Sequence, residues 1–419
     1  MNRNKVILRR YSLIISVLLT IIIVFAVYFS YQKHLEDRGK SAPMIAEIKE
    51  QLDQARALQK QGKLHESAEI FEQFALQGYP DAMFFLAKSY EKGWGVAPDL
   101  EKARSYLLNA VTYDFSYRGE SAYQLGRLFQ KSAGPNCHTI AVDWFIKALE
   151  WNYIKASMAL GTHFEKGLGV EQNFDRAIYY YQIASNEGIA IAALKHARLI
   201  LLGKYGISKD PVLGEELVAL AVAQLTEEAL AGKASSAKTL GRLYRDAQLI
   251  SPPSEIVRQE KTIKWFRLAS DFGDAGAMHD LGRYLLFIDE NVHHEEALVL
   301  LNKSAEKGHG GAATALGRMH LKQQYGLKEK GAVAWFEKGV KAGHTGSYKE
   351  LAVLYFEGKL IDKDLNKAII LVQKGANRGD ASSKRLLNKF LKRQKKEQEK
   401  QLKQKELYTK NTEKNSKNS

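Results

Sequence analysis

Two stretches place a serine three residues before a lysine, a spacing that can pair a nucleophile with its base. They run from Ser304 to Lys307 and from Ser235 to Lys238. Residues at i and i+3 share one face of a helix, and Ser-x-x-Lys is the spacing found in enzymes of peptidoglycan and β-lactam chemistry. Short motifs also arise by chance. A peptidoglycan- or β-lactam-active hydrolase is therefore the enzymatic alternative for this chain.

The histidines and the single cysteine do not form a metal-binding pattern. His293 and His294 are adjacent and cannot share a helix face, while His309 and His344 each follow a glycine at a repeated place. Cys137 is the only cysteine, which excludes an internal disulfide and a multi-cysteine metal site. We expect no metal, no cofactor and no catalytic residue, and hence a protein that is not an enzyme.

Basic residues recur at one place in a repeated pattern, directly after a Leu-Gly step or its equivalent. This basic ladder consists of Lys88, Arg127, Arg198, Arg242, Arg283 and Arg318. If the helices that carry these residues stack, the ladder can bind an acidic protein segment or an anionic polysaccharide through charge-assisted hydrogen bonds. In the structural alternative, the arginine stems cover grooves between repeats and pair with acids such as Glu165, Asp246 or Asp280.

The elements that must position the ladder recur along the chain. Each begins with a small residue, followed four positions later by a leucine or its substitute. The small residues are Ala82, Ser121, Ala156, Ala192, Ser236, Ala277, Ala312, Ser347 and Ser382, spaced 35 to 44 residues apart. A fixed period of this length is the signature of helical repeat proteins.

Glycines and aromatic residues occupy fixed places within each repeat. Glycine follows the leucine at Gly126, Gly161, Gly241, Gly282 and Gly317, and Gly-x-Gly turns end the first helix at Gly93, Gly95, Gly167 and Gly169. A second helix carries small residues at its start and seven positions later, with a bulky residue between them, which is tryptophan at Trp144, Trp265 and Trp335. Positions i, i+3 and i+7 share one face, so this pattern predicts a packing stripe.

These residues together resemble the Sel-1-like repeat, a relative of the tetratricopeptide repeat. The resemblance is strongest from Ala82 to Val96, from Ala156 to Val170 and in the helix that begins at Ala332. It implies an all-α fold, a right-handed α-solenoid of about eight to nine antiparallel helix-pair repeats. It also implies an adaptor or scaffold, here as a membrane-anchored bacterial member of the family.

The N-terminal region predicts a membrane anchor. Residues 11–32 contain no charged side chain, and about twenty apolar residues are enough to cross a bilayer as a helix. Four basic residues precede the span and three follow it closely, so the positive-inside rule favours a cytoplasmic N-terminus. The sequence therefore predicts a single-pass protein of the inner (cell) membrane with its repeats on the periplasmic or extracytoplasmic side.

The charge is concentrated at the C-terminus. The chain of 419 residues carries a formal net charge of +15, and residues 384–419 hold 13 basic and 4 acidic side chains. We divide the sequence into a basic N-terminal segment (1–10), a transmembrane helix (11–32), a linker (33–44), a tetratricopeptide-like N-terminal cap (45–80), the solenoid (81–390) and a basic, disordered tail (391–419). Basic surfaces favour anionic partners such as polymers and lipid headgroups.

Taken together, these patterns predict a non-enzymatic scaffold within an envelope polysaccharide-assembly, export or signalling complex. Its expected partners are proteins bound along the concave surface of the solenoid and the lipid bilayer around residues 11–32. We expect no nucleic acid partner. A cytoplasmic-facing regulatory adaptor is the remaining alternative, because the charge bias across the span is small.

Overall fold

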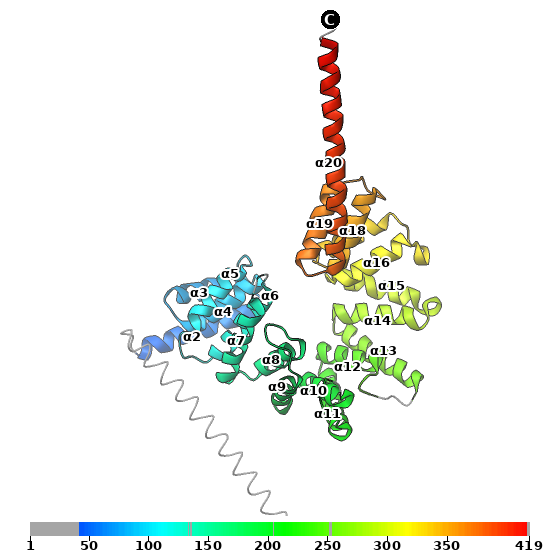
Figure 1. Cartoon of the computed structure of the whole chain (residues 1–419). Helices are drawn as coiled ribbons and strands as arrows, with labels where there is room; N and C mark the ends of the chain where they lie inside the picture. Colours follow the sequence, from blue (N-terminus) through cyan, green and yellow to red (C-terminus); the bar gives the residue numbers. More distant parts are fainter. Residues whose placement is uncertain (1–41, 133, 135, 204, 251–253, 417–419) are drawn as a thin grey trace, which may run out of the picture. The chain divides into compact units, whose positions relative to one another are not determined.

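The computed structural model describes residues 42–132, 134, 136–203, 205–250 and 254–416, and every regular element in these ranges is a helix (Figure 1). The chain divides into two compact units, residues 1–217 and 218–419. The predicted span at 11–32 lies outside the described residues. Among the helices that are described, none is both long and apolar enough to cross a bilayer.

The first unit consists of consecutive helical hairpins, each with a first and a second helix. Its hairpins are α2 (Ala42–Lys60) with α3 (Leu64–Leu76), α4 (Pro80–Lys92) with α5 (Leu100–Ala110), α6 (Arg118–Lys131) with α7 (Cys137–Glu150), and α8 (Lys155–Lys166) with α9 (Phe174–Asn186). Then follow α10 (Ala190–Leu202) and α11 (Pro211–Leu230), which runs into the second unit. The hairpin α2/α3 occupies the range predicted for the N-terminal cap.

The second unit continues the same alternation of helices. It contains α12 (Ala234–Asp246) with α13 (Glu255–Asp271), α14 (Ala275–Ile288) with α15 (Glu290–Glu306), α16 (Gly310–Leu321) with α17 (Gly331–Lys341), and α18 (Thr345–Glu357) with α19 (Leu365–Asn377). A short 3-10 helix, η1 (Gln324–Gly326), lies between α16 and α17, and α20 (Ala381–Ser416) ends the described chain.

Small residues on the second helices form the contact between helices, as the packing stripe predicts. The residues that open the stripe are fully buried: Ala103, Ala141, Ala177, Thr262, Ala297, Ala332 and Ala368. Seven positions later Ala110, Ala148, Ala184, Ala269 and Ser304 are also fully buried. Without large side chains at these positions, the two helices of a hairpin can approach closely, and each hairpin must cover its remaining apolar face with its neighbours.

The glycine of each Leu-Gly step faces a large side chain of the second helix. A Cβ atom added to Gly126, Gly161, Gly241 or Gly317 would lie 2.5 Å from a ring atom of Phe145, Tyr181, Phe266 or Phe336, respectively. These rings belong to the residue after the tryptophan position or its equivalent. Trp144, Trp265 and Trp335 instead each lie beneath a lysine ammonium group, at 4.2–5.1 Å. The ring that meets the glycine therefore belongs to the residue directly after the tryptophan position.

The second glycine of each Gly-x-Gly turn touches the backbone of the preceding repeat. A Cβ atom on Gly95 would lie 2.1 Å from the carbonyl oxygen of Leu64, and one on Gly169 would lie 2.3 Å from the carbonyl carbon of His138. Both glycines have positive φ, at 75° and 72°. The hydroxyl of Thr139 donates a hydrogen bond to the carbonyl oxygen of Gly169 at 3.1 Å. These turns therefore attach one repeat to the start of the previous second helix.

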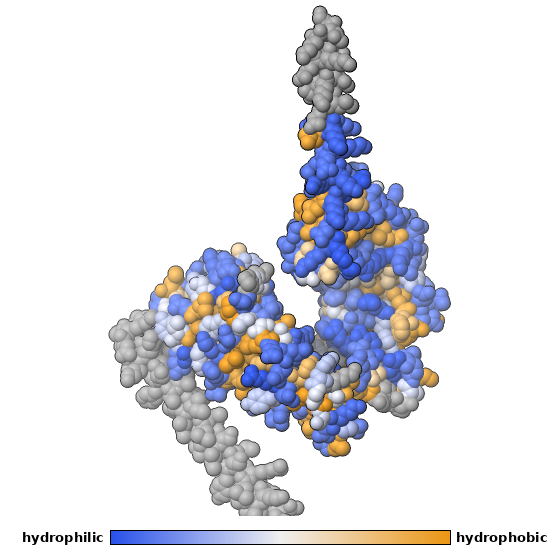
Figure 2. Space-filling model, viewed as in Figure 1, coloured by the Kyte–Doolittle hydropathy of each residue, from blue (hydrophilic) through white to orange (hydrophobic). Residues whose placement is uncertain are grey.

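Helix α20 differs from the tail that the sequence predicts. The helix continues to Ser416, beyond position 391 where disorder is expected. Lysine, glutamine and glutamate are all good helix formers, and the segment contains no glycine or proline to end the helix. Arg393 and Glu397 add an i,i+4 ion pair at 2.8 Å. In Figure 2 the coloured part of this helix that extends beyond the repeats is mostly hydrophilic, with one apolar patch.

Candidate functional site

All six residues of the basic ladder lie on first helices. Their positions, in chain order, are Lys88 on α4, Arg127 on α6, Arg198 on α10, Arg242 on α12, Arg283 on α14 and Arg318 on α16. We call the surface formed by the first helices of each unit the first-helix surface. The structure describes it separately for the two units.

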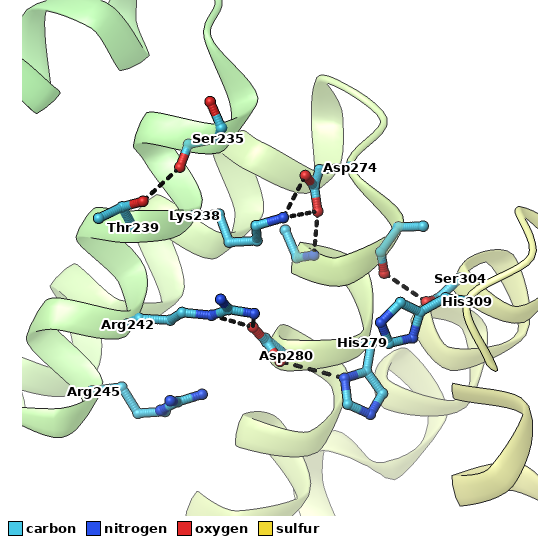
Figure 3. Close-up of polar contacts among 12 residues, drawn as sticks. Ser235, Lys238, Thr239, Arg242, Arg245, Asp274, His279, Asp280, Ser304 and His309 are labelled. Atoms are coloured by element: carbon cyan, nitrogen blue, oxygen red, sulfur yellow. Dashed lines mark hydrogen bonds and ion pairs between the residues drawn. The ribbon is translucent and has the colours of Figure 1, made fainter. Parts of the chain in front are cut away.

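In the second unit, two ladder arginines are paired with acids of the next first helix. Arg242 on α12 contacts Asp280 on α14 at 2.7 Å, as Figure 3 shows, and Arg318 on α16 contacts Glu350 on α18 at 2.8 Å. Burial would raise the pKa of Asp280, but hydrogen bonds from His279 and Arg242 outweigh it and hold the pKa at about 2. Arg242 therefore has a carboxylate partner that stays ionised, and Arg318 has its own carboxylate partner in Glu350.

Further along the same surface, Lys238 on α12 binds Asp274 just before α14. The two Nζ–O distances are 2.7 and 2.9 Å, and Asp274 also accepts a hydrogen bond from the backbone N–H of Ala277 at 2.7 Å (Figure 3). Asp274 thus caps α14 and connects it to α12. Adjacent first helices are joined by charge as well as by packing.

In the first unit, the carboxylate of Glu165 on α8 interacts with three side chains. Tyr181 donates a hydrogen bond to it at 2.5 Å, Lys195 lies 3.1 Å away, and Arg198 is in direct contact. Burial would raise the pKa of Glu165, but the Tyr181 hydrogen bond and the charges of Lys195 and Arg198 lower it overall. Lys88 pairs with Glu120 at 3.5 Å. Four of the six ladder cations therefore follow the structural alternative.

Two ladder cations have no acidic partner in the described part of the chain. Arg127 makes a hydrogen bond only to the side chain of Gln124, at 3.3 Å. Arg283 is exposed, and no hydrogen bond or ion pair from its side chain to another described residue is found. Arg283 is therefore the ladder residue of the second unit whose charge is open to a ligand.

Arg283 lines a pocket of about 330 Å³ on the first-helix surface of the second unit. The polar side chains around it are His279, Arg283, Thr314, Arg318, Lys322, Gln324 and His344. They come from α14, from α16 and its C-terminal end, from η1, and from the residue before α18. The volume lies at the small end of the range for ligand sites, large enough for a side chain or a small anion.

Most histidines of this region take part in hydrogen bonds or ring contacts with neighbouring residues. The rings of His279 and His309 lie 4.6 Å apart, and His309 caps α16 by accepting a hydrogen bond from the N–H of Ala312 at 3.1 Å. His344 Nδ1 lies 2.7 Å from the hydroxyl of Thr314. Burial lowers the pKa of His309 and His344, so both are neutral near pH 7. Among the described residues, no three His, Cys, Asp or Glu side chains converge to hold a metal.

The two Ser-x-x-Lys stretches do not form a nucleophile and its base. Ser304 is fully buried, and its hydroxyl donates to the carbonyl oxygen of Ala275 at 2.6 Å (Figure 3). Lys238 is bound by Asp274, while Ser235 contributes its carbonyl oxygen to a hydrogen bond from Thr239 at 2.8 Å. The buried Ser304 hydroxyl, bonded to the backbone, cannot attack a substrate, and Lys238 is held by Asp274 and is not free to act as the base for Ser235.

The ladder pattern alone does not reveal the pocket. Arg283 occupies the same place in its repeat as Arg242 and Arg318, which are paired. The sequence signal is the residue that faces the arginine from the next first helix, which lies 38 residues after Arg242 and 32 residues after Arg283 and Arg318. Arg318 meets Glu350 there, whereas Arg283 has Ala315, a residue that also lines the pocket.

The helix pairs, their period and their stacking contacts define a class of protein, the α-solenoids built from short helical repeats. The family model described as the Sel1 repeat matches residues 80–111, 119–150, 154–189, 190–224, 275–309, 311–344 and 347–380. The chain belongs to the Sel1 repeat family, whose members generally act as protein–protein interaction scaffolds. The family model leaves 225–274 unmatched, although α12 and α13 form a helix pair there.

Solved structures of bacterial repeat proteins are similar to this chain. A protective antigen of uropathogenic Escherichia coli with an SLR fold is 22% identical, with 78% of this chain and 71% of that one covered and a TM-score of 0.38. A Sel1 repeat protein from Oxalobacter formigenes is 25% identical, with 61% and 99% covered and a TM-score of 0.44. No curated protein matches the chain.

Proposed function

We propose that this chain is a membrane-anchored, non-enzymatic scaffold that binds an acidic segment of a protein partner on its first-helix surface. The observation that carries the proposal is the uncompensated charge of Arg283 in a surface pocket, on a face whose other arginines of the second unit already hold carboxylates. A repeat scaffold binds through such continuous faces. An anionic polysaccharide is the competing ligand for the same charges.

Photo-crosslinking in native membranes tests which face binds the partner. A photoreactive residue replaces Gln124 or Thr239 on the first-helix surface, or Tyr179 or Val299, which are exposed on second helices at 59% and 53%. We expect a crosslinked partner from Thr239, which lies in the unit that holds the pocket, and a crosslink from Gln124 would show that the first-helix surface of the other unit binds it as well. Crosslinks that form only from Tyr179 and Val299 would assign binding to the opposite surface and contradict the proposal.

The anchor proposal rests on residues 11–32 and their flanking charges, with the repeats outside the cytoplasm. The single cysteine provides a reporter of topology, because Cys137 at the start of α7 is partly exposed. We expect a membrane-impermeant maleimide to label Cys137 in intact spheroplasts as fully as after lysis. A Cys137→Ser variant gives the background. Labelling that requires lysis would place the repeats in the cytoplasm and favour a cytoplasmic-facing adaptor.

A further inference from the structure

The first helices of the second unit share a position that decides whether a ladder arginine is neutralised. This position is the third residue after the recurring small residue, and we call it the acid position. It holds Asp280 on α14, Ala315 on α16 and Glu350 on α18, at intervals of 35 residues. Asp280 pairs with Arg242 and Glu350 with Arg318, each across to the preceding first helix. Among these three helices of the second unit, only α16 has an alanine at the acid position, opposite Arg283.

The alanine has two consequences, one for charge and one for space. Glu350 accepts two hydrogen bonds from Arg318, from Nε at 3.0 Å and from a terminal nitrogen at 2.8 Å. Ala315 cannot supply such a carboxylate, so the positive charge of Arg283 is not compensated by a neighbouring acid. Because alanine ends at Cβ, the volume that a glutamate side chain would occupy is left open, and Ala315 lines the pocket. The pocket lies where the repeat pattern would otherwise place an acid.

The remaining lining fits a carboxylate on a short apolar stem. Lys322 is exposed, its side chain makes no hydrogen bond or ion pair with another described residue, and it adds a second positive charge at the pocket, while Arg318 is neutralised by Glu350. Ala315 and Met319 provide apolar surface for methylene groups. No phenylalanine, tyrosine or tryptophan lines the pocket, so it lacks the flat rings on which nucleic acid bases stack.

We infer that this pocket binds the carboxylate of an acidic side chain from the partner protein, which takes the place that Asp280 and Glu350 hold in the neighbouring repeats. Arg283 is the primary contact and Lys322 the second. The inference rests on the proposed function and narrows it to one pocket and one chemical group. Hydrogen bonds to charged groups contribute about 1.5–3 kcal/mol each, so loss of this contact corresponds to about a tenfold or greater loss of affinity.

The decisive variant is Ala315→Glu, which supplies the missing carboxylate from within the chain. The probe is a fluorescent synthetic peptide that carries two adjacent glutamates between alanines, with a glutamine peptide as its match, titrated by anisotropy into the purified full chain. We expect Ala315→Glu and Arg283→Gln each to weaken binding of the glutamate peptide at least about tenfold. Ala315→Gln fills the same space without charge and is expected to lose clearly less.

Other outcomes separate this inference from the proposed function. Because equivalent positions already hold acids, Ala315→Glu should unfold at the same temperature as the wild type. If this folded variant binds the glutamate peptide as well as the wild type, the pocket is not the site, although first-helix crosslinks would still support the scaffold. Equal losses in Ala315→Glu and Ala315→Gln would refute recognition by charge. Binding of an oligogalacturonate but not of the peptide would overturn the choice of a protein ligand.

Discussion

Replacing Gly169 by alanine is expected to destabilise the junction between two repeats by about 3 kcal/mol or more. An L-residue in the left-handed region costs roughly 1–2 kcal/mol, and a side chain forced into packed surroundings costs a further 1–3 kcal/mol. At Gly169 the added Cβ would lie 2.3 Å from the backbone of His138, which cannot turn away as a side chain can. Chemical denaturation followed by circular dichroism measures the loss.

Gly167 in the same turn is the matched control. Its φ of 65° is close to the 72° of Gly169, but the nearest atom to an added Cβ is the Cβ of Gln172 at 3.3 Å. Gly167→Ala should therefore lower the free energy of unfolding only by the cost of the left-handed backbone conformation, about 1–2 kcal/mol. Equal losses in the two variants would show that the contact between repeats contributes nothing beyond backbone conformation.

The second large effect is expected at Phe336, the ring that packs against Gly317. Phe336 is fully buried, and phenylalanine-to-alanine changes in cores cost about 3–5 kcal/mol. Trp335 is larger but only partly buried, with its indole N–H 3.2 Å from His320 Nε2 and a lysine ammonium group over its ring. We expect Phe336→Ala to lower the unfolding midpoint much more than Trp335→Ala does.

Repeat proteins can unfold in parts, so the comparison should also be made locally. Hydrogen exchange of α16 and α17 should accelerate strongly in Phe336→Ala, while α4 and α5 in the other unit keep their rates. Phe266→Ala, which opens the same space against Gly241, serves as an equivalent in another repeat. If Trp335→Ala had the larger effect on α16, the tryptophan would be the residue that holds the hairpin together.

The helical hairpins, the small-residue stripe and the turn glycines could be predicted because each depends on local spacing. Alanines at i and i+7 share a face whatever the neighbouring repeat does, and Gly-x-Gly marks a turn by its own conformation. The choice between Trp335 and Phe336 could not be predicted in this way. The two residues are adjacent on the helix, and only the rotation of α17 against α16 decides which ring meets Gly317.

The candidate site could be predicted even less, because it depends on contacts between residues of different repeats. The ladder cations share one local sequence context, yet Arg242 and Arg318 are neutralised whereas Arg283 is not. Their partners lie 32 to 38 residues away, so the sequence of the next repeat determines whether each arginine is paired with an acid. Reading the ladder together with the acid position would have singled out Arg283 among the ladder cations of the second unit, because alanine replaces an acid only at Ala315 among the three first helices that follow α12, namely α14, α16 and α18.

The acid position also affects how such proteins can change over generations. Glutamate and aspartate codons each become alanine codons by a single base change, so one point mutation can convert an internally neutralised arginine into an open anion site. The reverse mutation closes the site again. Because Asp280 and Glu350 are partly buried at the first-helix surface but lie outside the apolar core, we expect this exchange to leave the folding of each hairpin largely intact. Duplicated repeats can thus diversify in what they bind while they remain alike in how they stack.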